Sequence, residues 1–134
     1  MVAVIEATLY ASLLALLLFV LSIRVIGLRG NPAFGFIAQG KGDDERLQRA
    51  IRAQGNFTEY VPTILILLFF LETSGAASDK LHALAGAFLL GRLMHGICMG
   101  FMRSNLLLRV AGTALTLLPL AAAAIALLLQ ALKG

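Results

Sequence analysis

Four long apolar stretches most strongly constrain how this chain can fold. They run from about residue 5 to 26, 46 to 71, 81 to 102 and 107 to 132. Each reaches the roughly 20 residues that a helix needs to cross a bilayer. With 60% hydrophobic and 13% charged residues, the chain also lacks the polar surface that covers a soluble globule. The sequence therefore predicts an all-α fold: a single integral membrane domain, residues 1–134, built as a four-helix bundle.

The basic residues gather on one side of the predicted membrane. Eight of the eleven Lys and Arg flank the first-to-second and third-to-fourth connections: Arg24, Arg29, Lys41, Arg46, Arg49, Arg52, Arg103 and Arg109. Lys80 and Lys133 lie on the opposite side, and Arg92 lies within a span. By the positive-inside rule, the two basic connections face the cytoplasm and both termini face outward. This topology accounts for the basic composition and argues against a nucleic-acid partner.

The predicted connections carry turn and cap signals. The first, from Gly27 to Glu45, contains Asn31-Pro32 and several glycines, which favour a turn-rich segment without a helix. The acidic run Asp43 to Glu45 is typical of an N-cap and first turn of the second helix, because negative charge stabilises that end. Ser78-Asp79 is a candidate N-cap for the third helix.

The second span carries a polar face where it enters the membrane. At about 100° per residue, six side chains fall within an arc of roughly 100°. They are Arg49, Arg52, Asn56, Glu59, Tyr60 and Thr63. Cations, a carboxylate and an amide on one face predict a site for a small zwitterionic ligand. Arg52 and Glu59 lie two turns apart, too far for a direct pair but suitable for bracketing such a ligand.

Glu59 requires an explanation, because a carboxylate within a membrane segment costs about 2.5 to 3.5 kcal/mol on insertion scales. It either binds a ligand or forms an ion pair with Arg92 on the third span. His95, one turn from Arg92, is a proton carrier, a ligand contact or a buried hydrogen-bonding residue. Two alternative functions follow: a proton-coupled transporter that uses Glu59, Arg92 and His95, and a non-catalytic protein that binds a lipid headgroup. The pattern of His, Cys and carboxylates predicts no metal site.

The third and fourth spans differ in their predicted packing. Small residues four apart on the third span, such as Ala87 and Gly91, predict a tight helix interface. The fourth span has no polar side chain deeper than Thr113 and Thr116, and it is expected to be a lipid-facing scaffold.

The stretch Arg49-x-x-Arg52-Ala-Gln-x-Asn56-x-x-Glu59-Tyr60-x-Pro62 resembles the second-helix signature of the membrane-associated proteins in eicosanoid and glutathione metabolism, the MAPEG family. Microsomal glutathione transferases and leukotriene C4 synthase belong to this family. The third-helix stretch Gly91 to His95 is similar to a bacterial subgroup. The resemblance covers the whole four-helix layout and implies a homotrimer in a bacterial inner membrane, with glutathione as co-substrate bound between protomers and a lipophilic small molecule as second substrate.

The resemblance also assigns roles to individual residues. It implies that Arg52 binds a glutathione carboxylate, that Asn56 and Tyr60 bind its backbone, and that Glu59 binds its amino group. Arg49, Gln54 and His95 complete the expected binding residues; Gln54 points away from the others on the helical wheel, as an interprotomer pocket would require. The resemblance implies that Arg109 stabilises the glutathione thiolate, with Arg24 as a second candidate. His95 and Phe101 stand near the positions of family tyrosines that hold glutathione.

Overall fold

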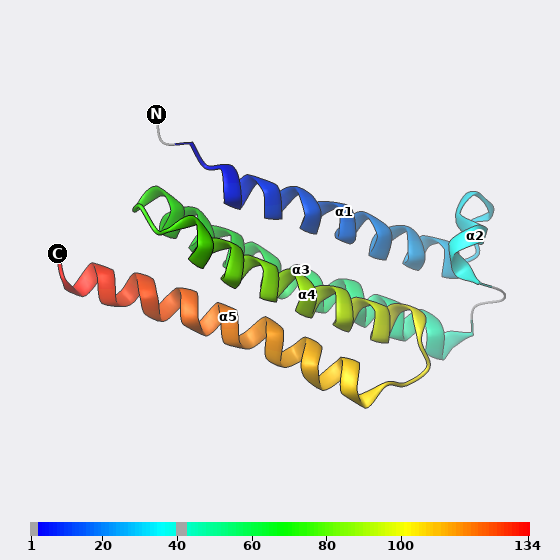
Figure 1. Cartoon of the computed structure of the whole chain (residues 1–134). Coiled ribbons are helices and arrows are strands. Elements are labelled where there is room, and N and C mark those ends of the chain that lie inside the picture. Colours follow the sequence, from blue (N-terminus) through cyan, green and yellow to red (C-terminus); the bar gives the residue numbers. More distant parts are fainter. Residues whose placement is uncertain (1–2, 40–42) are drawn as a thin grey trace.

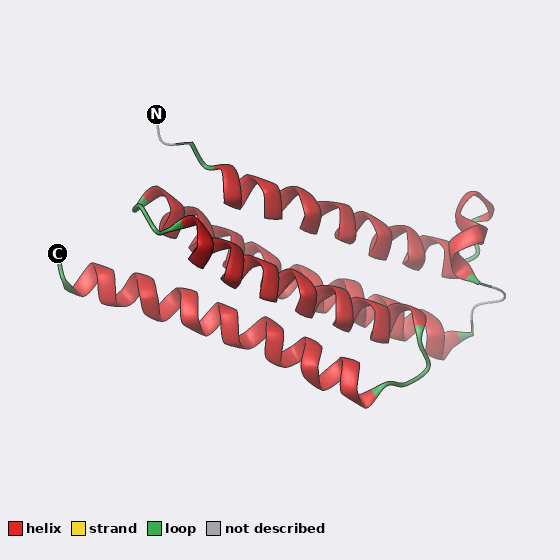
Figure 2. Ribbon diagram, viewed as in Figure 1, coloured by secondary structure: helices red, strands yellow, loops and turns green. Residues whose placement is uncertain are grey.

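The computed structural model describes residues 3–39 and 43–134, and its regular structure in these ranges is entirely helical. Four long helices follow one another up and down: α1 (Ile5–Leu28), α3 (Asp44–Thr73), α4 (Ser78–Phe101) and α5 (Leu106–Leu132) (Figures 1 and 2). Each is long and apolar enough to cross a membrane. The prediction of an all-α fold with four spans is confirmed, and each helix boundary lies within three residues of the predicted one.

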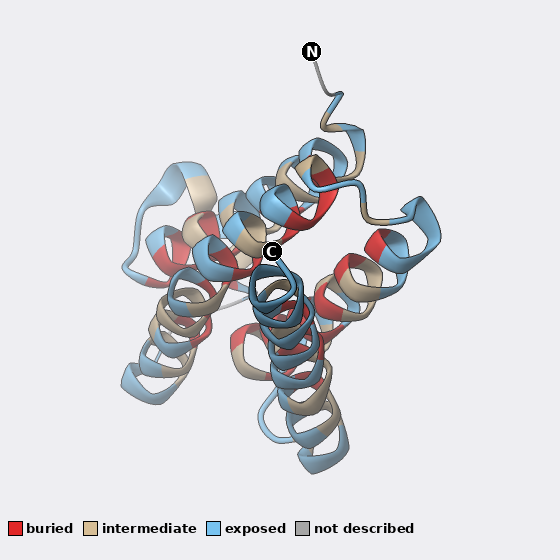
Figure 3. Cartoon of the chain, turned by 90° about the vertical axis from the view of Figure 1, so that its left-hand side faces the viewer, coloured by how far each residue is buried: buried red, intermediate tan, exposed pale blue. Residues whose placement is uncertain are grey.

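The helices α3 and α4 form the centre of the bundle. The helix α1 packs against both of them on one side, and α5 packs against both on the other. Buried residues line the surfaces of the helices that face one another (Figure 3). The core that they form includes Leu14, Phe57 and Phe88. Large apolar side chains such as Leu16 and Leu118 point outward and are 64% and 68% exposed. Outward-facing leucines suit a chain surrounded by lipid rather than water.

The tightest approach is between α4 and α5. A Cβ placed on Gly91 would lie 2.9 Å from the carbonyl oxygen of Gly112, and one on Gly112 would lie 2.8 Å from the backbone nitrogen of His95. Only glycine fits at such distances, so the predicted small-residue interface is confirmed at Gly91. The expectation that the fourth span, α5, is a lipid-facing scaffold was incomplete. One face of this helix is buried against its neighbours at Gly112, Thr116, Pro119 and Ala123.

The first connection contains helical structure that was not expected. A 3-10 turn, η1 (Pro32–Phe34), leads into the short helix α2 (Gly35–Ala38). The prediction of a segment without a helix was wrong because Asn31 accepts a hydrogen bond from Ala33 N and Pro32 occupies the first helical position, where proline is tolerated. Ala38 is buried against the end of α1 and the start of α3. Gly40, Lys41 and Gly42 lie outside the described residues.

Side chains cap several helix ends. Asp43 is the N-cap of α3, as predicted, and its carboxylate accepts a hydrogen bond from Arg46 N at 2.7 Å. The predicted cap of α4 was wrong: Ala77 occupies that position, and the Ser78 hydroxyl instead donates to the Glu6 carboxylate. Glu72, near the end of α3, accepts hydrogen bonds from the backbone nitrogens of Glu6 and Ala7. A carboxylate from another helix therefore caps the first turn of α1.

Candidate functional site

The polar face of α3 lines an open pocket together with one side of α4. Arg52, Asn56 and Glu59 come from α3, and His95 and Met99 come from α4. The cavity volume is about 360 Å³, within the range of roughly 300 to 1,000 Å³ that is common for small-molecule sites. Three of the six residues predicted to share one face therefore do line one cavity, and His95 joins them from the neighbouring helix.

The two ends of this pocket carry opposite charges. Arg52 and Glu59 are both exposed, and neither side chain forms a hydrogen bond or ion pair with another described residue. Seven residues separate them on α3, which corresponds to about 10 Å along the helix axis. The pocket thus offers a cation and a carboxylate that are both available to a ligand.

A buried arginine holds Asn56 in place between these charges. Arg92 is only 2% exposed, and its Nη1 donates to Asn56 Oδ1 at 2.7 Å. Its Nε donates to the Thr116 hydroxyl at 2.9 Å, and that hydroxyl donates to the Gly112 carbonyl at 2.7 Å. Arginine has no acceptor, so the oxygen of the Asn56 amide must face Arg92. The amide NH₂ is left to donate to a ligand in the pocket.

The Glu59–Arg92 ion pair considered above does not form among the described residues. The Arg92 guanidinium lies inside the bundle, 5.6 Å from the ring centre of Tyr60 and 6.0 Å from that of Phe88. Glu59 is exposed on the outer side of α3. This alternative for Glu59 is wrong, because the two helices turn the side chains of Glu59 and Arg92 in different directions. Neutral oxygens and aromatic faces stabilise the buried charge instead.

Tyr60 and Gln54 point away from the pocket in the single chain. Tyr60 is half-buried and packs against the main core, near Arg92. Gln54 donates from Nε2 to the Ser22 hydroxyl on α1 at 2.8 Å. Its direction agrees with the helical wheel, which turned Gln54 away from the polar face.

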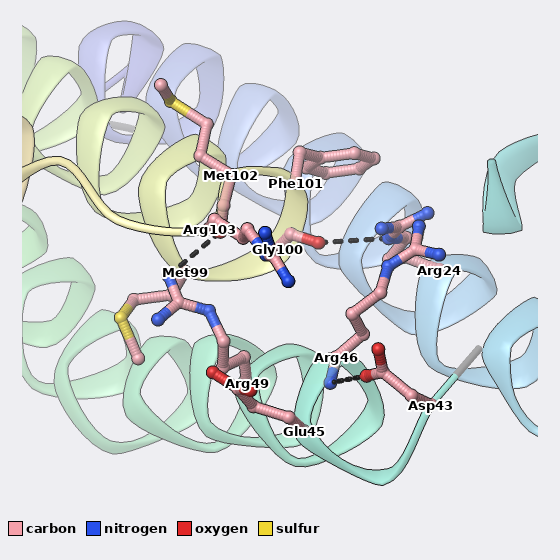
Figure 4. A pocket seen from close by; sticks show the side chains of 10 residues that line it. All are labelled: Arg24, Asp43, Glu45, Arg46, Arg49, Met99, Gly100, Phe101, Met102 and Arg103. Atoms are coloured by element: carbon pink, nitrogen blue, oxygen red, sulfur yellow. Dashed lines mark hydrogen bonds between the residues drawn. The ribbon is translucent and has the colours of Figure 1, made fainter. Parts of the chain in front are cut away.

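Arg24 and Arg49 fasten the end of α4 to the two neighbouring helices (Figure 4). Arg24 Nε donates to the carbonyl of Gly100 at 2.9 Å, and Arg49 Nη2 donates to the carbonyls of Cys98 and Met102, each at 2.9 Å. The last carbonyls of a helix have no partner within the helix, and cations are favourable there. Neither arginine borders the pocket of Arg52. The structure thus separates Arg49 from the other residues of the polar face, and it separates Arg24 from the predicted binding residues in that pocket.

Arg109 lies at the start of α5, beside rather than in the pocket. It is exposed and lines a smaller hollow of about 40 Å³ with Arg49 and Asn105. Met99 borders both this hollow and the pocket of Arg52. The candidate thiolate-stabilising residue therefore does not line the pocket of Arg52, but the hollow that it lines shares Met99 with that pocket.

Two contributors to the site were not predicted from the sequence. Met99 lines the pocket but carries no sequence signal that separates it from other apolar residues of α4. Thr116 supports Arg92 from α5. It lies deeper along α5 than Arg109 and Thr113. A hydroxyl at that depth in a membrane helix indicates that a polar partner lies opposite.

Comparison with known proteins places the chain among membrane proteins. Residues 7–129 match the MAPEG family. The inner membrane protein YecN of Escherichia coli (strain K12) is 42% identical over 89 residues, and the match covers 66% of this chain and 66% of YecN. YecN from a second Escherichia coli strain matches to the same extent. The matched region thus spans about two thirds of these relatives, and no solved structure matches the chain.

Proposed function

The chain belongs to the MAPEG family, and on this basis we propose that it is a membrane glutathione-dependent transferase or peroxidase acting on lipophilic electrophiles. The observation that carries the proposal is the pocket in which Arg52, Asn56 and Glu59 lie together with unpaired charges at its two ends. Glutathione is a zwitterionic tripeptide with carboxylates and one ammonium group. Its chemistry complements those charges, which face no protein partner in the described part of the chain.

The dimensions of the pocket suit this ligand. A tripeptide spans about 10 Å when extended, by the chain reach of roughly 3.5 Å per residue. The backbone positions of Arg52 and Glu59 are separated by a similar distance along α3. In the proposed complex Arg52 binds a carboxylate and Glu59 binds the ammonium group. The Asn56 NH₂ donates to a backbone carbonyl of the ligand, and His95 contacts it from α4.

The chemistry requires an ionised thiol. A free thiol has a pKa near 8.5, so only a minor fraction is thiolate at neutral pH. A guanidinium beside the sulfur favours the anion, and we assign this role to Arg109. The thiolate attacks an electrophilic carbon, a carbon–sulfur bond forms, and the electron pair moves to the leaving group or the activated double bond. An apolar electrophile dissolved in the bilayer can approach the open side of the pocket.

We further propose that the enzyme is a homotrimer in a bacterial inner membrane, with the pocket at the cytoplasmic side and both termini outside. The pocket is open, while Gln54 and Tyr60 face other directions in the single chain. An adjacent protomer would close the pocket and add contacts from a second set of helices. The relatives named inner membrane protein YecN support the location, and the basic residues of two connections support the orientation. Native mass spectrometry in mild detergent should give three chains per particle; a monomer would contradict the trimer.

Thermal unfolding with and without glutathione tests the binding step. Circular dichroism is the suitable readout, because glutathione would react with thiol-specific dyes. At 100 times its dissociation constant, a ligand stabilises the folded state by about 2.7 kcal/mol. We expect this stabilisation to be lost in Arg52→Ala and retained in Arg29→Ala, a matched change at an exposed arginine on the same side of the membrane. No response of the native protein at millimolar glutathione would refute the proposal.

Steady-state kinetics tests the division of roles. Arg52→Ala should raise KM for glutathione with a smaller effect on kcat, because it removes binding that is equal in the ground and transition states. Arg109→Ala should lower kcat more than it raises KM, because it removes stabilisation of the attacking thiolate. If Arg52→Ala lowered kcat and Arg109→Ala raised KM, the two roles would be exchanged. If Arg109→Ala changed neither constant, Arg109 would take no part in the reaction.

One observation makes the transporter alternative less attractive. A proton relay through Glu59, Arg92 and His95 needs each group to gain and lose a proton. Arg92 is held by Asn56 and Thr116, and a guanidinium stays protonated in proteins. Arg92 is therefore better suited to fixing the pocket than to passing protons through the bundle.

A further inference from the structure

A second cavity lies at the basic end of the bundle, where α1 ends, α3 begins and α4 ends (Figure 4). Four arginines line it: Arg24, Arg46, Arg49 and Arg103. Two carboxylates, Asp43 and Glu45, also line it, so the lining carries four positive and two negative charges. This cavity shares only Met99 with the pocket proposed for glutathione.

The positive charge of this cavity is only partly neutralised by the protein. The hydrogen bonds of Arg24 and Arg49 go to backbone carbonyls, which satisfy N–H groups but carry no charge. Asp43 uses one carboxylate oxygen to cap the backbone nitrogen of Arg46. The Arg103 side chain is exposed and forms no hydrogen bond with another described residue. The site therefore has guanidinium donors available for an anion.

One donor beside the cavity is not satisfied by the described residues. Arg49 Nε is buried and has no hydrogen-bond partner within the described part of the chain. Buried polar groups in native proteins are nearly always paired with protein, ligand or ordered water, so this one calls for an explanation. It belongs to an arginine that lines the cavity and whose two hydrogen bonds both run from Nη2.

We propose that this cavity binds a phosphate group, either free inorganic phosphate or the headgroup phosphate of an anionic lipid. Its volume of about 90 Å³ lies far below the roughly 300 Å³ at which drug-sized ligands are usually held, which limits the occupant to one small group. Arginines from α1, from α3 and from the loop after α4 can donate to a tetrahedral oxyanion from several directions. Basic pockets between membrane helices at the cytoplasmic side are also where lipid phosphates are found.

Inorganic phosphate is the first probe. Cys98 is the single cysteine of the chain and is buried, so a thiol-reactive dye reports unfolding of the detergent-purified protein. We expect phosphate to raise the melting temperature relative to chloride at equal ionic strength. In Arg103→Ala the midpoint phosphate concentration should rise about tenfold, as expected for losing one hydrogen bond to a charged group. Arg29→Ala, an exposed arginine at the same end that does not line the cavity, should leave it unchanged.

The second probe separates the two sources of phosphate. Delipidated protein is mixed with phosphatidylglycerol or with zwitterionic phosphatidylcholine, and bound lipid is counted by native mass spectrometry. Retention of phosphatidylglycerol that depends on Arg103 but not on Arg29, with no response to inorganic phosphate, assigns the site to a lipid. If neither probe distinguishes Arg103→Ala from Arg29→Ala, the proposal is overturned. Glutathione should raise the stability of Arg103→Ala and Arg29→Ala equally. Failure of the phosphate proposal can therefore be distinguished from failure of the glutathione proposal.

Discussion

The contact between Arg92 and Thr116 leads to a sharp prediction about stability. The Thr116 side chain is 1% exposed, accepts from Arg92 Nε at 2.9 Å and donates to the Gly112 carbonyl at 2.7 Å. Thr116→Val keeps the shape of the side chain and removes its oxygen. A buried guanidinium N–H then loses its acceptor, while the α4–α5 contact at Gly112 keeps its van der Waals surface.

The expected magnitude follows from two bounds. A hydrogen bond to a charged group contributes about 1.5 to 3 kcal/mol in water-soluble proteins. Side-chain hydrogen bonds between membrane helices average about 0.6 kcal/mol, with a maximum near 1.7. Because Arg92 is charged and buried, we expect the upper part of the membrane range, about 1 to 1.7 kcal/mol of destabilisation for Thr116→Val.

A matched control and a double-mutant cycle isolate this contact. Thr113 is exposed and its hydroxyl donates to Arg109 O on its own helix, so Thr113→Val should change stability by less than about 0.5 kcal/mol. Reversible unfolding in mixed micelles, followed by circular dichroism, gives the free energies. In an Arg92→Met background Thr116→Val should have little effect. Additive effects within about 0.3 to 0.5 kcal/mol in the cycle, or equal effects of the two valine variants, would refute the coupling.

Two further predictions concern packing and capping. Gly112→Ala should destabilise the bundle by about 1 to 3 kcal/mol, because the added Cβ meets the backbone of α4. Gly55→Ala, where the Cβ meets nothing within 4 Å, should stabilise it by about 0.5 to 1 kcal/mol. If both variants change the free energy of unfolding in the same direction, the packing argument is contradicted. Glu72→Gln should cost about 0.5 to 2 kcal/mol by weakening the cap on α1. Asp79→Asn, at an exposed carboxylate on the same side, is its control, and hydrogen exchange at the first amides of α1 should increase only in the Glu72 variant.

Periodicity predicted the candidate pocket only in part. It placed Arg52, Asn56 and Glu59 on one face of a helix, and the structure brings them to one cavity. Arg49 shares that face but lies seven residues, or about 10 Å, before Asn56 along the axis. At that depth α4 is ending, so Arg49 meets free carbonyls instead of the pocket. A helical wheel gives the direction of a side chain and contains no information about what the neighbouring helix offers at each depth.

The buried arginine illustrates the same limit. The cost of an intramembrane charge indicated that Arg92 needs partners, and it has them in Asn56, Thr116 and the face of Tyr60. The sequence could not distinguish these partners from Glu59, because choosing among groups at similar depth requires the rotation of each helix about its axis. Each rotation is set by how a helix packs against its neighbours, as α4 does against α5 at Gly91 and Gly112.

The amino-acid sequence by itself determined the four helices, the cap at Asp43 and the basic end of the bundle. These features follow from local geometry and from the partition of side chains between water and lipid, both of which act within one segment. The tertiary structure alone decided that Glu72 caps α1, that Arg24 and Arg49 hold the end of α4, and that Arg92 fixes Asn56. Each of these contacts joins different helices, and its formation depends on helix rotation and depth, which only the packed bundle sets.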